Sequence, residues 1–367
     1  MTVFVVIVIL IAILAFLILA HEFGHFVAAR LLGIRVDEFG IGFPPRAFLL
    51  GKIGDTEYTV NWIFFGGFVR LYGEEEDKGI HGTGSLLDSP RWKQAVILLA
   101  GVAMNVVVAY ALFAFALGIG VPAIVDQLQP DQAAQLLVSD VIPGSPADQA
   151  GIAADDQILS VEDAQGDTVP VLTPAALVAF VSDHGGQPLT ITFMAGQTTI
   201  TKTVIPANSV DPQNAGRPAI GIGVVLVATV ALAPLQAMQQ AFWTTEGAFV
   251  LVGQGVGEIF STAAHGSPDL SNVVGPVGLY WVVGSTVQSG FGNLLELVAF
   301  ISVNLAIVNM IPIPALDGGR FVVLLIEALL RKRAPRLAIQ LLDTIGVALI
   351  ILLAVTVTYH DLAIHFM

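Results

Sequence analysis

The sequence predicts a polytopic α-helical membrane protein with about four transmembrane helices and a separate domain inserted between the second and third. Three observations support this fold class. Of the 367 residues, 55% are hydrophobic and only 12% are charged, a composition outside the range of soluble enzymes. Four apolar segments are long enough to cross a membrane, and most basic residues lie in two of the segments that connect them.

The first apolar segment, residues 3–20, contains 18 apolar residues without a break. At about 1.5 Å per residue in a helix, this length suits a hydrocarbon core of about 30 Å. A cleaved signal peptide is the alternative, but no Lys or Arg precedes the segment and the helical pattern continues through residues 21–32. The other three predicted spans cover residues 95–121, 297–316 and 337–358.

Two further apolar stretches, residues 219–235 and 242–264, are interrupted by glycine, proline and polar residues. We interpret them as a strand followed by an interfacial or partly embedded helix. The predicted organisation therefore has an N-terminal membrane region with two spans, an inserted region, a region with the strand and interfacial helices, and a C-terminal membrane region with two spans. These four regions cover residues 1–121, 122–218, 219–293 and 294–367.

Basic residues predict the orientation, because loops retained in the cytoplasm keep Lys and Arg near the spans. Eight of the 15 basic residues lie between the first and second spans, and five lie between the third and fourth. Residues 122–293 carry 14 acidic residues and only two basic ones, Lys202 and Arg217. We therefore expect both termini and the inserted region outside the cytoplasm.

Charge and cysteine content exclude several classes of function. The formal net charge of -14 is the opposite of the basic surface that nucleic acids require, so we expect no nucleic-acid partner. The chain contains no cysteine, which excludes a cysteine nucleophile and thiolate ligands for zinc or iron–sulfur clusters. Any bound metal ion must therefore use His, Asp or Glu.

The inserted region contains a pattern that resembles the core of a bacterial PDZ domain. Residues 141–152 read Val-Ile-Pro-Gly-Ser-Pro-Ala-Asp-Gln-Ala-Gly-Ile and precede a predicted strand around Ile158. Ser145 suits the cap of a short helix that Pro146 opens, and Gly151 suits its end in the left-handed conformation. Alternation within residues 189–204 predicts further strands. The resemblance places an α+β PDZ-like domain at about residues 125–205, and it implies that peptide termini bind there by strand addition.

The sequence His21-Glu22-Phe23-Gly24-His25 directly follows the first apolar segment. In a helix, residues four apart share a face, so both imidazoles can bind one metal ion while Glu22 projects toward a water on that ion. Three ionisable groups at the end of an apolar helix are costly unless they face an internal polar site. The motif therefore predicts a zinc site in which Glu22 acts as a base.

A third ligand is expected from another part of the chain, because Ala28 and Leu31 stand where the extended metzincin pattern has Gly and a third His. Residues 309–319 read Asn-Met-Ile-Pro-Ile-Pro-Ala-Leu-Asp-Gly-Gly at the end of the third predicted span. Asp317 in this segment lies on the same side of the membrane as His21 in the predicted orientation. Asp-Gly-Gly is also typical of a simple turn. The two prolines that distort the span, and the predicted position of Asp317 at the same depth in the membrane as His25, favour Asp317 as the ligand.

Together these features resemble the site-2 protease family of intramembrane zinc metalloproteases, in its bacterial regulator-of-sigma-E-protease branch. The resemblance covers nearly the whole chain and rests on the His-Glu-x-x-His motif, the Asp317 segment and the PDZ-like module between them. Additional matching segments are Gly66-Gly67-Phe68-Val69-Arg70-Leu71, Ala100-Gly101 with Asn105, Val274-Gly275-Pro276-Val277-Gly278, and Ile301-Ser302-Val303-Asn304-Leu305. Two features depart from the family pattern: Val102 replaces a proline, and the inserted region fits one PDZ domain instead of two.

The resemblance implies that His21, His25 and Asp317 bind one Zn²⁺ ion and that Glu22 is the general base. The implied activity is the hydrolysis of peptide bonds within transmembrane segments. Its substrates would be single-span membrane proteins, such as anti-sigma factors or remnant signal peptides. The implied location is the inner membrane of a bacterial cell, with the active site near the cytoplasmic side and the PDZ-like domain outside.

The resemblance also implies how an unwound substrate is held. It assigns substrate binding to Asn304 and Asn309, and to a strand containing Gly67, Phe68 and Val69. This strand would belong to a cytoplasmic, membrane-associated β hairpin that adds a strand to the substrate.

A membrane-anchored PDZ scaffold or pseudoprotease, which binds substrates without cutting them, is the competing interpretation. Such a protein has no need of Glu22 or of both histidines, so their presence favours an enzyme. For Asn105 we expect interhelical hydrogen bonds without substrate contact. We expect a solvated surface position for the remaining histidines, which are His81, His184, His265, His360 and His365.

Overall fold

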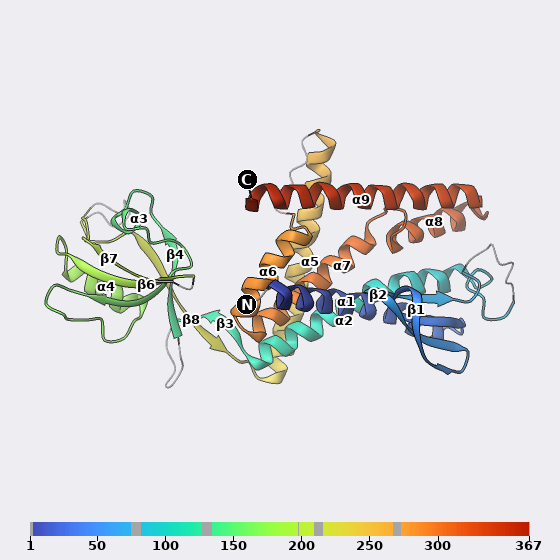
Figure 1. Ribbon diagram of the computed structural model, residues 1–367, viewed down its shortest axis with the longest axis horizontal. Coiled ribbons are helices and arrows are strands. Elements are labelled where there is room, and N and C mark those ends of the chain that lie inside the picture. The colour runs from blue at the N-terminus through green and yellow to red at the C-terminus, as the bar shows by residue number, and fades with distance from the viewer. Residues whose placement is uncertain are drawn as a thin grey trace. The chain divides into compact units, whose positions relative to one another are not determined.

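The computed structural model describes residues 3–74, 82–126, 134–196, 198–208, 216–266 and 273–366 (Figure 1). The chain forms two compact units. The first, called the membrane unit below, comprises Met1–Ile119 and Leu232–Met367, and the second, the inserted unit, comprises Gly120–Ala231. Residues 127–133 and residue 197 of the predicted PDZ-like range lie outside the described residues, as does His81.

Among the described residues, four helices of the membrane unit are long and apolar enough to cross a membrane, as the sequence predicts. They are α1 (Val3–Leu31), α2 (Arg91–Ile119), α7 (Phe291–Met310) and α9 (Arg336–Phe366). The third helix ends earlier than the predicted boundary at residue 316. Pro312 and Pro314 explain this end, because proline has no N–H donor and disfavours helical geometry in the residue before it. A separate helix, α8 (Asp317–Leu330), begins after the turn.

Helix α2 packs against both α1 and α7, and α1 and α2 run side by side (Figure 1). Apolar side chains of α1 and α7 form a common core with α6 (Pro276–Gln288). Helices α1 and α2 approach closely at Gly24, where an added Cβ would overlap the carbonyl oxygen of Ala100. This contact brings the His-Glu-x-x-His segment directly against α2.

The predicted interfacial helix at 242–264 is part of a longer helix, α5 (Pro234–Ala264), which packs against α2 and α7.

Helix α6 packs against α1, α7 and α9. Asp361 of α9 is buried and accepts hydrogen bonds from the N–H groups of Gly275 and Gly278, at 3.3 and 2.8 Å. A carboxylate on one helix thus satisfies free N–H groups at the first turn of another.

Two long strands, β1 (Val36–Ile53) and β2 (Thr56–Leu71), bend and pair antiparallel to form a small sheet in the membrane unit. Its four segments lie in the order 46–53, 56–63, 36–43 and 67–71, because Glu38 pairs with both Glu57 and Arg70. The buried Glu38 carboxylate also forms ion pairs with Arg46, at 2.9 Å, and with Arg70. Among the described residues, segment 67–71 pairs on one side only.

The inserted unit has a six-stranded antiparallel sheet and two helices around its own hydrophobic core. The order of the strands is β3-β8-β4-β5-β6-β7. Their bounds are β3 (Val121–Ile124), β4 (Ala134–Val141), β5 (Gln157–Glu162), β6 (Leu189–Ala195), β7 (Thr198–Val204) and β8 (Ile222–Val230), and the helices are α3 (Pro146–Gln149) and α4 (Pro174–Asp183).

Several local predictions in the inserted unit are confirmed. Ser145 caps α3 by accepting a hydrogen bond from the N–H of Asp148, and Gly151 has a φ of +80°. The strand predicted within residues 219–235 is confirmed, but the predicted boundary that separates it from the inserted region is wrong, because the inserted unit continues to Ala231. The strand in this range is β8, which pairs with β4 and buries Leu226 and Ala228. This pairing joins residues 81 to 94 positions apart, from Val141 with Ile222 to Ala134 with Ala228, so no local pattern predicts it.

The chain leaves and re-enters the membrane unit at neighbouring points. The N–H of Leu232 donates a hydrogen bond to the carbonyl of Leu117, at 2.9 Å. Within the inserted unit, Val121 pairs with Val230. The two segments that connect the units therefore lie next to each other, both where they leave the membrane unit and where they enter the inserted unit.

Candidate metal centre

The candidate metal centre begins on α1, where His21 and His25 lie one helical turn apart. Both side chains are buried, at 8% and 9% relative exposure, although each carries a polar ring. Their ring centroids are 4.8 Å apart and their planes are nearly perpendicular, at 82°. Their Nε2 atoms are 3.1 Å apart, so both rings present this nitrogen to the same point.

Asp317, the first residue of α8, reaches the same point from the other half of the membrane unit. Its Oδ2 atom lies 2.9 Å from Nε2 of His21 and 3.3 Å from Nε2 of His25. Gly318 and Gly319 make this position accessible. A Cβ on Gly318 would overlap the carbonyl groups of Met310 and Ile311, and one on Gly319 would overlap that of Ile313. The helix start can thus fold tightly against the end of α7.

The residues present fit a zinc ion. The three ligand atoms lie within 4.8 Å of one another, and Oδ2 of Asp317 is a buried acceptor without a hydrogen-bond donor. Two imidazole nitrogens and one carboxylate oxygen are ligands that Zn²⁺ accepts, and three protein ligands leave a fourth position for water or substrate. This donor set matches catalytic zinc sites, whereas structural sites use four protein ligands.

Helix α2 forms the wall behind the two histidines. Nδ1 of His25 lies 2.7 Å from the carbonyl oxygen of Ile97, and Nδ1 of His21 lies 3.3 Å from the side-chain nitrogen of Asn105. Between them, Gly101 has no side chain, and a Cβ there would overlap the rings of both histidines. The two histidine rings can therefore lie this close to α2 only because residue 101 is glycine.

Glu22 lies between the two histidines in sequence and is half-buried. Its carboxylate interacts electrostatically with His21, His25 and Asp317. The catalytic candidate is thus next to the ligand set, as the sequence motif predicts.

Of the two predicted substrate-binding asparagines, Asn304 donates a hydrogen bond to the carbonyl of Phe300 in its own helix, at 3.0 Å. Asn309 is half-buried in the last turn of α7, immediately before the chain turns toward Asp317. Five residues of helix correspond to a rotation of about 140°, so the two side chains leave α7 in different directions. Asn309 is the one adjacent in sequence to the ligand loop.

The predicted strand with Gly67, Phe68 and Val69 lies at an edge of the small sheet, against α1. A Cβ on Gly67 would come within 2.8 Å of Leu19, and one on Gly66 would come within 3.3 Å of Ile18. Leu19 precedes His21 by two residues. The strand therefore packs against the helix that carries the metal-binding histidines.

Asn105 makes the interhelical contacts that the sequence predicts. Its backbone carbonyl accepts a hydrogen bond from Ser302 of α7, at 2.8 Å, and its side chain faces His21 of α1. The sequence interpretation did not foresee that one of these contacts reaches a candidate zinc ligand. The spacing of Gly101 and Asn105, four residues apart on one helical face, is the sequence signal for this contact. The Ile97 carbonyl belongs to the backbone and has no such signal.

His184 also departs from the expected solvated position. Its Nδ1 lies 2.7 Å from the carbonyl oxygen of Phe180, and its Nε2 lies 3.1 Å from Oδ2 of Asp163. The Phe180 carbonyl, and then Asp163, raise the pKa of His184. Burial alone would raise the pKa of Asp163, but hydrogen bonds from the N–H groups of Asp167 and Gln165, and from His184, lower it.

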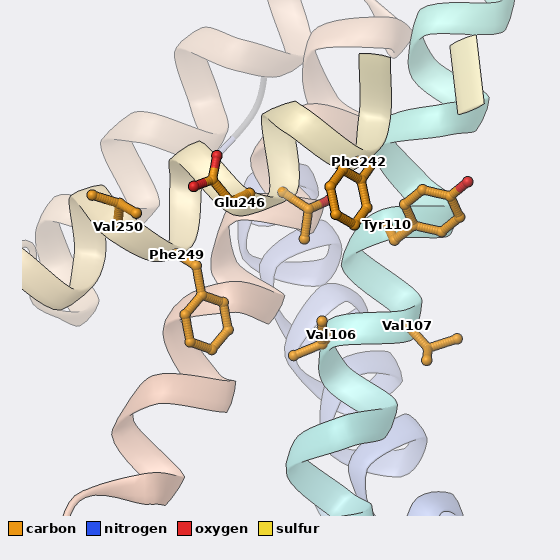
Figure 2. A pocket seen from close by; sticks show the side chains of 8 residues that line it. Val106, Val107, Tyr110, Phe242, Glu246, Phe249 and Val250 are labelled. Atoms are coloured by element: carbon orange, nitrogen blue, oxygen red, sulfur yellow. The ribbon is translucent and has the colours of Figure 1, made fainter. Parts of the chain in front are cut away.

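A separate apolar cavity of about 550 Å³ lies between α2 and α5 (Figure 2). It contains none of the predicted site residues. Figure 2 shows the rings of Phe242 and Tyr110 close together at one end and Glu246 on α5. The residues that line the cavity are Val106, Val107, Tyr110, Phe242, Thr245, Glu246, Phe249 and Val250.

A helix with a His-Glu-x-x-His motif, an aspartate from a second helix and a unit with four candidate spans define the class of membrane zinc metallopeptidases. Comparison with known proteins identifies the family. The model of peptidase family M50 matches residues 9–353, so the chain belongs to this family. The protein is a zinc metalloprotease of the site-2 type, and Zn²⁺ is its cofactor.

Relatives of similar length come from several bacteria. A protein of Clostridium perfringens named "Putative zinc metalloprotease" is 34% identical over 357 residues, which cover 96% of this chain and 98% of that protein. A Nostoc protein with the same designation is 33% identical over 333 residues and covers 89% of this chain and 87% of its own length.

Two solved domains match a smaller part of the chain. The PDZ domain of an SdrC-like protein from Listeria monocytogenes has a TM-score of 0.21 and 18% identity, covering 27% of this chain and 92% of its own. The second domain of another Listeria protein has a TM-score of 0.20 and 20% identity, with coverages of 28% and 90%.

Proposed function

We propose that this protein hydrolyses peptide bonds within the transmembrane segments of single-span membrane proteins. His21, His25 and Asp317 hold the zinc ion, and Glu22 is the general base. One observation carries the proposal: three buried ligand atoms converge at one point, and two of them belong to a helix long and apolar enough to span a membrane. Anti-sigma factors and remnant signal peptides are substrates of this kind.

Zinc, when bound, supplies Lewis-acid chemistry, which polarises a peptide carbonyl and increases the acidity of water. The carboxylate of Glu22 accepts the proton of the attacking water and transfers it to the amine of the leaving peptide. Burial of the two histidines among α1 and α2 fixes their rings before substrate binds. Such fixed geometry lowers the reorganisation needed during the reaction.

A transmembrane helix satisfies all its backbone groups internally, so its peptide bonds must be unwound before they can be cut. The strand with Gly67, Phe68 and Val69 offers unpaired backbone groups to an extended substrate, and its position beside α1 supports this role. The side chains of Asn304 and Asn309 offer additional hydrogen bonds. The substrate thus exchanges helical hydrogen bonds for bonds to the enzyme.

The proposed site lies near the cytoplasmic face of a bacterial inner membrane, and the inserted unit lies outside. The distribution of basic residues supports this orientation, since 13 of 15 lie in the two segments assigned to the cytoplasm. Reporter fusions test it. A fusion after Asp163 should report an extracytoplasmic position and one after Gly84 a cytoplasmic position; the reverse result would contradict the orientation.

The inserted unit binds peptide termini in this proposal. A groove of about 210 Å³ lies between α4 and the beginning of β8. Its walls include the apolar side chains of Leu177, Val181 and Ile220, and the residues 222–225 of β8 have no partner strand on one side within the described chain. Among the described residues that line the groove, Arg217 is the only charged one, so it supplies a positive charge for a terminal carboxylate.

The decisive experiment compares wild type with Glu22→Gln on a model single-span substrate in lipid vesicles. The amide is nearly isosteric but cannot accept the proton, so cleavage should fall by about 10² to 10⁴ while zinc content stays stoichiometric. Substrate should still crosslink to the variant. Appreciable cleavage by Glu22→Gln would contradict the mechanism. Absence of cleavage by the wild type, with crosslinking retained, would instead support the scaffold interpretation.

A further inference from the structure

One face of α2 presents three different groups to the metal centre at intervals of four residues. These groups are the carbonyl oxygen of Ile97, the bare Cα of Gly101 and the side-chain amide of Asn105. Residues spaced by four lie above one another on a helix. The first group contacts His25, the second leaves room for both rings, and the third contacts His21.

The Ile97 carbonyl determines which nitrogen of His25 is free. A carbonyl oxygen can only accept a hydrogen bond, so Nδ1 of His25, 2.7 Å away, must carry the proton. In the neutral ring, Nε2 then has a free lone pair and faces Asp317. His25 is thus held in the tautomer that binds a metal through Nε2.

His21 requires the same tautomer, because its Nε2 also faces Asp317, at 2.9 Å. Its Nδ1 must therefore donate a proton to an acceptor. Asn105 is the neighbour of this nitrogen, and its Oδ1 is a buried acceptor with no hydrogen-bond partner. The two ends of a side-chain amide are nearly identical in shape, so a rotation of the amide by about 180° brings Oδ1 to Nδ1.

We propose that Asn105 is a positioning residue: its Oδ1 accepts the Nδ1 proton of His21 and so keeps Nε2 of His21 free for zinc. The inference rests on the proposed role of His21 as a ligand. It gives the two histidines equivalent partners, a backbone carbonyl for His25 and a side-chain carbonyl for His21. Partners of this kind orient metal-binding histidines in other proteins and increase their basicity.

The position of Asn105 suits this function. The residue is fully buried, with 0% exposure, and its backbone is tied to α7 through Ser302. The side chain therefore cannot turn toward solvent. Of the two contacts that α2 makes to the ring nitrogens, only this one depends on the identity of a side chain.

The test measures zinc affinity in the purified full-length protein by competition with a chelator, independently of proteolysis. Asn105→Leu keeps the approximate size but removes the acceptor, and we expect zinc to bind about 10 to 100 times more weakly. Ser302→Ala is the matched control, because it removes a neighbouring hydrogen bond to the same residue without touching His21. Its zinc affinity should stay within about threefold of wild type.

Asn105→Asp shows which residue donates the hydrogen bond between Asn105 and His21. It also tests the inference if Asn105→Leu does not fold. A carboxylate only accepts hydrogen bonds from His21, so zinc should bind at least as tightly as in wild type. Weakening of zinc binding by tenfold or more in Asn105→Asp, or unchanged affinity in folded Asn105→Leu, would overturn the inference. His21→Ala tests the role of His21 as a ligand separately from the role of Asn105. If this variant retained stoichiometric zinc, the ligand assignment itself would be wrong.

Discussion

Nε2 of His21 and Oδ2 of Asp317 lie 2.9 Å apart, although the two residues belong to opposite ends of the chain. The contact joins α1 to the beginning of α8, and it depends on the turn that ends α7 at Met310. The metal centre is therefore a tertiary feature of the membrane unit. Its integrity requires that the N-terminal and C-terminal halves pack together.

The first prediction concerns this ligand set. His25→Ala and Asp317→Ala should each lose stoichiometric zinc, because removal of one of three protein ligands leaves an incomplete site. Metal analysis of the purified protein measures the loss. Asp343→Ala, on α9 of the same unit, is the control and should retain the metal. Stoichiometric zinc in both ligand variants would show that the site is elsewhere.

The second prediction tests the close contact between α2 and the histidines. Gly101→Ala should weaken zinc binding by at least about tenfold, because the new Cβ overlaps both rings and displaces their Nε2 atoms. Gly118→Ala is a matched control on the same helix, since a Cβ there has no atom within 4 Å. That change should leave zinc affinity intact and stabilise the helix by about 0.5–1 kcal/mol. Equal effects of the two changes would contradict the geometry.

The third prediction separates substrate binding from metal binding. Asn309→Ala should keep its zinc but crosslink less to a model transmembrane substrate, because the unwound segment loses replacement hydrogen bonds. Asn293→Ala provides the control, since Asn293 lies in the first turn of the same helix and donates to Ser289. Undiminished crosslinking with Asn309→Ala would exclude the substrate-holding role without affecting the proposed zinc chemistry.

The fourth prediction is a pH dependence in the inserted unit. The folded pKa of His184 is raised, so its protonated ring stabilises the unit below the ordinary value of 6.5, and this contribution disappears as pH rises through the folded pKa. The folded pKa of Asp163 is lowered, so its contribution is present above 3.8 and disappears only as pH falls through the folded value. Stabilisation by the pair is therefore greatest between these two ordinary values.

Hydrogen exchange of α4 in the full-length protein, corrected for intrinsic rates, measures this effect. Protection should be greater at pH 6 than at pH 9, and His184→Gln should remove the difference. His265→Gln is the control because His265 is exposed. A pH effect that persists in His184→Gln would assign it to another group.

Much of the fold can be predicted because a membrane imposes strong constraints on composition. The four candidate spans follow from apolar length alone, although their ends differ from the predicted bounds by several residues. The end of α7 lies six residues before the predicted one, where Pro312 and Pro314 follow the helix. His21, His25 and Asp317 can be identified because few residue types bind zinc in a chain without cysteine. The role of Asn105 is harder to predict from the sequence, because it depends on which face of α2 packs against α1. Strand β8 is misassigned because its partner β4 is remote in sequence.

The hydrogen bond between Leu117 and Leu232 has a consequence for how such proteins diversify. This hydrogen bond joins the end of α2 to the residue where the chain re-enters the membrane unit, and α2 and α5 also pack against each other within that unit. Loss, duplication or exchange of the inserted unit would alter only the length of a loop, whose closure entropy changes slowly with length. The membrane unit and the inserted unit can therefore evolve as separate parts within one gene.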